Sequence, residues 1–136
     1  MSQILMAITI DTECDKSNNW TNSDPLSFNS IYHGIPNKLQ PLFESFSIKP
    51  TYFLSPEAVR DKQSVEVLSA FKNHSELGTH LHADYIEPEK SFDNFSGKET
   101  HAFQTDYASE IEFKKLENLT NDLKNSFDFF PKVFRA

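Results

Sequence analysis

The chain has little of what marks several common protein classes. It has a single cysteine, Cys14, which cannot form an internal disulfide and therefore indicates a reducing compartment. Its 13 Lys and Arg residues are outnumbered by 20 Asp and Glu residues, which gives a net charge of −7. Nucleic acids and anionic membrane surfaces favour clustered cations, so we expect neither as a partner.

Long hydrophobic runs are also missing. No stretch approaches the roughly 20 apolar residues that a membrane-spanning helix requires. The N-terminus lacks the basic segment and the small-residue cleavage site of a signal peptide. We therefore predict a soluble, cytoplasmic protein. Phenylalanine is abundant, with 13 residues in 136, and predicts one domain spanning residues 1–136 with an aromatic-rich core.

Four short apolar or β-branched runs alternate with stripes of apolar residues at helical spacing. The first run is nearly continuous in apolar residues, as expected of a strand that is buried on both faces of a parallel sheet. Strands are predicted at 4–10, 51–54, 77–82 and 132–135. Long polar loops are predicted at 14–33 and 84–106.

Three helices are predicted between these strands. The first opens near Gly34 with Pro36 in its first turn, and Ser64 caps the second. The third opens with a capping box from Ser109 to Glu112. We assign the Phe residues of all three helices to the core. The apolar faces are Leu39, Leu42, Phe43 and Phe46 in the first, Val65, Leu68 and Phe71 in the second, and Phe113, Leu116, Leu119, Leu123 and Phe127 in the third.

The alternation of strands and helices predicts an α/β fold. It is the pattern of a parallel sheet of about four strands with crossover helices. In such sheets and barrels, sites gather at the carboxyl ends of the strands. Polar residues stand at three of these predicted ends, and we interpret them as one site: Asp11 and Glu13, His80 and His82, and Arg135.

The segment from His80 to Asp84 supplies half of a metal site in either of two geometries. If the chain is extended, positions i and i+2 share a face, so His80 and His82 point together. If it turns helical, His80 faces Asp84 at i and i+4. Gly78 lies just before this segment and lets the backbone pack closely there.

Two imidazoles and one carboxylate are a familiar ligand set for catalytic zinc, with one position left open for water. A second carboxylate near that water can act as a general base. Asp11 and Glu13 can supply one of each, and their spacing does not fix which residue takes which role. Arg135 can orient the base or stabilise developing negative charge. We interpret Cys14 as a small residue that does not bind the metal, and His33, His74 and His101 as solvated histidines in loops or at an element end.

Motifs at the four strands carry a resemblance to a known family. They are TIDTE at 9–13, PTYFL at 50–54, ELGTHLH at 76–82 and FRA at 134–136. In this order they resemble the NodB-homology polysaccharide deacetylases, carbohydrate esterase family 4. The closer likeness is to the branch with Asp-x-Glu and His-Leu-His motifs, and it extends over the whole chain.

The resemblance implies a deformed (β/α) barrel that binds a divalent metal, usually zinc, and hydrolyses N-acetyl groups of amino sugars. By position, Asp11 matches the general base and Arg135 the arginine of the third motif. Glu13 and His80 match metal ligands. The remaining ligand is His82 or Asp84, because the second histidine of the family commonly lies four residues after the first.

Family members continue beyond the third motif into strands that supply an acetyl pocket and a late histidine acting as general acid. The chain therefore resembles an N-terminal half, truncated after that motif. We expect a metal-dependent deacetylase acting on an N-acetylated carbohydrate, a polysaccharide or its precursor, if missing motifs or a partner chain complete the site. The alternative is a catalytically incomplete half-barrel that acts as a metal-binding or dimerising module, and a homo-oligomer fits either expectation.

Other hydrolase classes fit the motifs less well. Amidohydrolases and PHP phosphoesterases also use His-x-His but place it after the first strand, where this chain has Asp11 and Glu13. A glycosidase can use such a carboxylate pair. It has no need of His80 and His82, so the metal-dependent deacetylase remains the preferred interpretation.

Overall fold

A computed structural model describes residues 4–91 and 104–136 and shows an α/β fold with four parallel strands. Each strand pairs with the next along the chain, in the order β1-β2-β3-β4. Consecutive strands of a (β/α) barrel pair in this way, so the arrangement is consistent with a partial barrel. The strands are β1 (Thr9–Thr12), β2 (Thr51–Leu54), β3 (Glu76–His80) and β4 (Phe134–Arg135).

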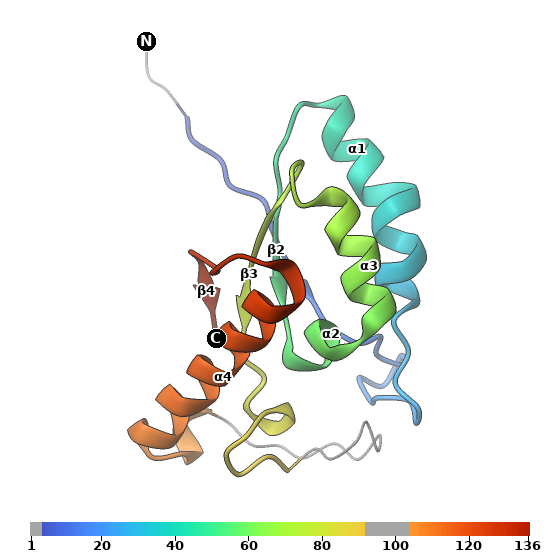
Figure 1. Ribbon diagram of the computed structural model, residues 1–136. Coiled ribbons are helices and arrows are strands. Elements are labelled where there is room, and N and C mark those ends of the chain that lie inside the picture. The colour runs from blue at the N-terminus through green and yellow to red at the C-terminus, as the bar shows by residue number, and fades with distance from the viewer. Residues whose placement is uncertain (1–3, 92–103) are drawn as a thin grey trace.

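Helical segments connect the strands, as the sequence predicts (Figure 1). Between β1 and β2 lie the π-helical segment η1 (Ser30–Leu39) and α1 (Gln40–Ser45). Between β2 and β3 lie α2 (Pro56–Arg60), which the sequence analysis did not predict, and α3 (Lys62–Phe71). The described part of the last connection contains the short η2 (Ala83–Tyr85) and η3 (Gln104–Asp106), followed by α4 (Ser109–Phe127).

The hydrophobic core lies between the sheet and these helices. In Figure 1, η1, α1 and α3 lie on one side of the strands, and η1 and α4 both contact α3. Tyr52 and Leu54 of β2 are fully buried in this layer, together with Leu68 of α3 and Leu119 and Leu123 of α4. Burial of these side chains fixes which face of the sheet the helices cover.

The opposite face of the sheet carries the predicted site residues. Side chains alternate along a strand, so the neighbours of the residues that pack on the helices point away from the helical layer, although Phe53 and His80 among them are also buried. In the register of the sheet, Asp11 lies beside Phe53, and Phe53 lies beside Gly78. Two residues further along, His80 lies beside Arg135. The predicted site residues on the strands therefore share this face, near the carboxyl edge of the sheet.

The strand predicted at 4–10 is wrong at its start, because β1 begins only at Thr9. Ile4, Leu5 and Met6 are 91%, 88% and 77% exposed. The neighbouring strand explains the difference: β2 begins at Thr51, whose backbone N–H donates to Ile8. Within the described residues, no strand extends further to pair with the residues before Ile8.

The helix starts also differ from the predictions. The first helical segment begins at Ser30, so Pro36 and His33 lie inside η1, and His33 is not in a loop. Asp61, and not Ser64, caps α3, because its side chain accepts a hydrogen bond from the Ser64 N–H. The N-cap of α4 is Ala108 without a side-chain hydrogen bond, so the predicted capping box is not formed.

Two Phe residues that were assigned to the core are on the surface. Phe46 is 69% exposed and Phe113 is 70% exposed. The buried face of α4 is defined by residues spaced by four, from Lys115 through Leu119 to Phe127. Phe113 lies two residues before this series and therefore points to the opposite side of the helix. Leu42 of α1 is also half-exposed.

Candidate metal centre

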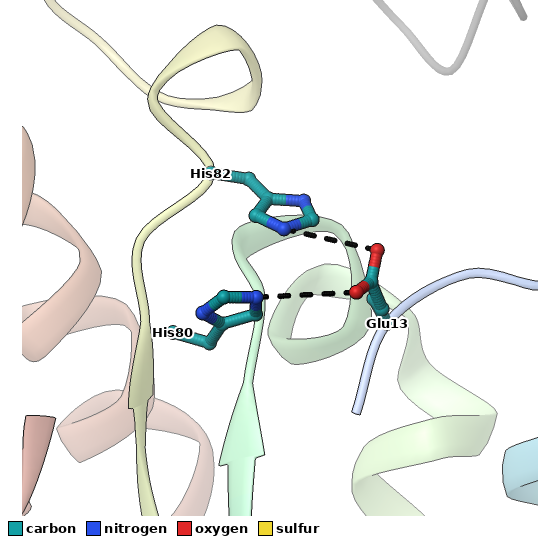
Figure 2. Close-up of side chains that lie close together, drawn as sticks. All are labelled: Glu13, His80 and His82. Carbon is teal, nitrogen blue, oxygen red and sulfur yellow. Dashed lines mark ion pairs between the residues drawn. The ribbon is translucent and has the colours of Figure 1, made fainter. Parts of the chain in front are cut away.

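Glu13, His80 and His82 come together at the carboxyl ends of β1 and β3 (Figure 2). The two carboxylate oxygens of Glu13 face one imidazole each. Its Oε1 lies 3.9 Å from His80 Nε2, and its Oε2 lies 3.7 Å from His82 Nε2. The two imidazole rings are 4.4 Å apart between centroids.

These three residues lie close enough to hold a metal ion. One ligand atom from each lies within 4.8 Å of the others. Zinc bonds of about 2.0–2.1 Å place tetrahedral ligands about 3.3 Å apart, so a small closure of the observed distances is sufficient. Two imidazoles and a carboxylate therefore fit a divalent metal both in chemistry and in spacing.

His82, and not Asp84, is the second residue of the pair with His80. The backbone is still extended at His82, with φ −95° and ψ 97°, and η2 begins only at Ala83. His80 and His82 therefore share a face at i and i+2. Among the described residues, Asp84 belongs to no group of potential ligands, and its charge acts on Lys115 of α4.

Both imidazoles turn Nε2 toward Glu13 and Nδ1 toward an acceptor. His80 Nδ1 lies 3.5 Å from the backbone oxygen of Arg135. His82 Nδ1 lies 3.9 Å from Oε1 of Glu57. Histidines that bind metals commonly donate their second ring N–H to a carbonyl or carboxylate, which fixes the tautomer and the ring orientation. The surroundings of both rings therefore favour Nε2 as the metal-binding atom.

Glu57 is a site residue that sequence reasoning missed. It lies in the first turn of α2 and is fully buried. Its Oε1 accepts a hydrogen bond from the Cys14 N–H at 3.4 Å, and its Oε2 has no hydrogen-bond partner among the described residues. The available signal was Ser-Pro-Glu at 55–57, because Pro and an acidic residue after Ser are typical of a helix N-terminus.

The electrostatic environment keeps His80 neutral at pH 7. Burial and the neighbouring His82 lower the pKa of His80 below its ordinary value of 6.5, against the opposing charges of Asp11 and Glu13. A neutral imidazole is the form that binds metals. His80 therefore does not have to lose a proton to bind a metal.

Cys14 is buried beside the cluster. Burial and the charge of Glu57 raise the pKa of its thiol to about 12. Its Sγ lies 3.6 Å from the side-chain oxygen of Asn22 and 4.0 Å from the Tyr85 hydroxyl. Cys14 lies outside the group of potential metal ligands that the described residues form.

Arg135 crosses the open face of the sheet from β4 to β1. Its Nη1 lies 3.1 Å from Asp11 Oδ1 and donates to Thr9 Oγ1 at 3.2 Å. The guanidinium carbon lies 6.0 Å from the centroid of the Phe53 ring, which lies between the two strands. Arg135 therefore orients the Asp11 carboxylate beside the metal cluster.

The segment after His82 is fastened to two helices. Lys115 of α4 is fully buried, and its ammonium donates to the backbone oxygens of Ala83 and Ile86, both at 2.8 Å. Burial lowers the pKa of this ammonium. Arg60 of α2 donates to the backbone oxygen of Tyr85 at 2.9 Å. The backbone that follows His82 is therefore held by two cations, Lys115 of α4 and Arg60 of α2.

The remaining histidines lie apart from this cluster. His33 lies in η1, and His74 lies 3.6 Å from Glu44 with 62% of its side chain exposed, as expected of a solvated histidine. His101 lies outside the described residues.

The strand ends thus bring together the residues predicted from the sequence: Asp11, Glu13, His80, His82 and Arg135. No helix among residues 4–91 and 104–136 is long and apolar enough to cross a membrane. Comparisons with protein-family models, with curated proteins and with solved structures found no match to this chain.

Proposed function

We propose that this chain provides the metal centre of a hydrolase that removes N-acetyl groups from an amino sugar of a polysaccharide or its precursor. The observation that carries the proposal is the cluster of Glu13, His80 and His82, with both Nε2 atoms directed at one carboxylate. The motif order supports it, because the chain resembles the NodB-homology deacetylases at all four strands.

Glu13, His80 and His82 would hold the metal, for which zinc is our first expectation. Imidazole and carboxylate donors also suit cobalt, manganese and nickel. When bound, a divalent metal supplies Lewis acidity toward water and toward the acetyl carbonyl.

Asp11 is the proposed general base. Arg135 holds its Oδ1 at 3.1 Å, and the other oxygen, Oδ2, accepts the proton of the attacking water. The guanidinium fixes this carboxylate in orientation, because it is a rigid donor group that remains charged at every physiological pH. Asp11 and Glu13 thereby divide the two roles that their spacing alone left open.

Two variants test these roles separately. His80→Ala removes a ligand, and we expect the purified protein to lose its metal, measured by elemental analysis. Asp11→Asn keeps all three ligands, and we expect it to retain about one divalent ion per chain while acetate release from N-acetylglucosamine oligomers stops.

His74→Ala, which changes a surface histidine next to Glu44, is the matched control and should keep its metal. Retention of the metal in His80→Ala would contradict the assigned ligands. Acetate release by Asp11→Asn at the rate of an active wild type would contradict the assigned base.

A dimerising metal-binding module is the second candidate. Ile4, Leu5 and Met6 are exposed, and Phe134 on the edge strand β4 is 48% exposed. Exposed apolar side chains and open sheet edges favour association with another chain. A dimeric mass in solution, with metal bound and no acetate released, would favour this candidate over the hydrolase.

A further inference from the structure

A cavity of about 530 Å³ opens beside the metal cluster. Asp11 and Glu13 form part of its wall, so it is continuous with the proposed reaction centre. The loop after β1 contributes Lys16 and Trp20, and Asn29 adds an amide before η1. The volume lies within the range of small-ligand pockets, roughly 300–1,000 Å³.

Trp20 is displayed at this cavity by an ordered turn. It is the only tryptophan in the chain and is 76% exposed. Its backbone N–H donates to Ser17 at 2.9 Å, and the Ser17 N–H donates to Thr21 at 2.9 Å. A β-bridge between Lys16 and Asn22 closes the turn. The indole therefore remains accessible to a ligand in the cavity while its backbone is held in place.

The charges of the cavity argue against an anionic ligand. Asp11, Glu13 and Asp15 line it, and Lys16 is the cation among its lining residues. Lys16 already donates to Asn22 at 2.6 Å and lies 3.7 Å from Glu13. A phosphate or carboxylate would meet more negative than positive charge. A neutral ligand with hydroxyl groups would instead find acceptors in the carboxylates and a flat apolar surface in the indole.

We propose that this cavity is a sugar-binding cleft in which the indole of Trp20 stacks on a pyranose ring. A pyranose has a face of C–H groups and a rim of hydroxyls, which complement the indole and the carboxylates respectively. The stacked ring neighbours the sugar whose acetyl group reaches Glu13, His80 and His82, and this placement rests on the proposed function. Binding of the sugar to the cavity does not require the metal.

Trp20 is the only tryptophan in the chain, so the fluorescence of the protein reports on ligand binding at this cavity. We would titrate metal-free protein, prepared with a chelator, with the trimer of N-acetylglucosamine and separately with cellotriose, and record tryptophan emission. We expect a saturable change of emission with at least one of these sugars, and the same midpoint in the surface variant His74→Ala. No saturable change with either sugar would overturn the proposal.

Variants separate stacking from a nonspecific effect. Trp20→Ala should weaken sugar binding, measured by saturation-transfer NMR, by about thirtyfold or more, the loss that defines a tryptophan contact at a binding hot spot. Trp20→Phe keeps an aromatic face and should retain most of the affinity. Phe113→Ala removes an aromatic side chain of similar exposure on α4 and should leave binding unchanged. Equal affinity in Trp20→Ala and the wild type would overturn the proposal.

The failure of this proposal is distinguishable from that of the proposed function. Metal binding without sugar binding would support the proposed metal centre and overturn the proposed sugar-binding cleft. Sugar binding to a chain that takes up no metal would support the sugar-binding cleft and overturn the proposed metal-dependent hydrolase.

Discussion

At the scale of single residues, Glu57 is the most unusual side chain near the metal centre. It is fully buried, and its Oε2 has no hydrogen-bond partner among the described residues, which is costly for a polar group removed from water. Its other oxygen, Oε1, lies 3.9 Å from His82 Nδ1. A metal bound at His82 Nε2 would make the Nδ1–H a stronger donor, so Glu57 would support metal binding through His82.

Replacing Glu57 with Gln should therefore weaken metal binding. The change keeps the volume of the side chain but removes the charge that faces His82. We expect the affinity for zinc to fall by about tenfold or more, the usual effect of removing such an outer partner. Calorimetric titration of chelator-treated protein with zinc measures it.

The matched control is Glu44→Gln, which changes the carboxylate in the surface pair with His74. Zinc affinity should not change in this variant. Equal affinities of Glu57→Gln and the wild type would show that Glu57 does not support His82.

At the scale of elements, the contact between β3 and β4 depends on Gly78. A Cβ atom at this position would lie 2.6 Å from Val133 Cγ2, 2.8 Å from the Val133 backbone oxygen and 2.9 Å from Phe53 Cδ1. That backbone oxygen accepts a hydrogen bond from Thr79, which helps to hold β4 against the sheet. The absence of a side chain at Gly78 therefore lets β4 place Arg135 over Phe53.

Gly78→Ala should destabilise the protein by about 1–3 kcal/mol, because the backbone of Val133 cannot move aside without loss of strand pairing. Chemical denaturation followed by circular dichroism measures the free energy of unfolding.

Gly34→Ala is the control for this substitution. Gly34 lies in η1, and the nearest atom to an added Cβ is Ser30 Cβ at 4.0 Å. Its unfolding free energy should change by less than about 1 kcal/mol, toward greater stability. Similar losses in the two variants would mean that close packing at β4 is not the cause.

At the scale of the whole molecule, Arg60 joins three distant parts of the chain. From α2 it donates to Asp122 of α4 and to Glu87 in the segment after η2, both at 2.9 Å. It also holds the backbone oxygen of Tyr85. These contacts tie the segment that follows His82 to the helical layer.

This network makes stability depend on pH in the acid range. Hydrogen bonds from Lys90, from its own backbone and from Arg60 lower the pKa of Glu87 from its ordinary 4.5 to about 2. Because the pKa is lower in the folded state, the stabilisation is complete above about pH 4.5 and is lost as pH falls toward 2. Glu87→Gln should flatten the dependence of unfolding free energy on pH across that window. The expected effect is small, because half of the Glu87 side chain is exposed to solvent.

Glu66→Gln, on the exposed face of α3, serves as the comparison and should keep the acid dependence of the wild type. An identical pH dependence in Glu87→Gln and the wild type would remove Glu87 from the account of acid stability.

The sequence by itself determined the alternation of four strands with helical connections and the positions of the site motifs, although it did not reveal α2. Strand and helix periodicities are local properties, and parallel strands bring their carboxyl ends to one edge. Asp11, Glu13, His80 and Arg135 could therefore be assigned to one site before any distance was known. The sequence also offered the pairing of His80 with His82 that the structure shows, as one of two alternatives beside His80 with Asp84.

Only the tertiary structure decided which local alternatives hold. The backbone is extended at His82, next to Ala83 whose carbonyl Lys115 holds, and this conformation selected His82 over Asp84. The start of β2 set the start of β1, which left Ile4 exposed. The packing of α2 against α3 and α4 brought Glu57 of α2 to within 3.9 Å of His82. These outcomes depend on contacts between residues far apart in the chain, and local periodicity carries no information about such contacts.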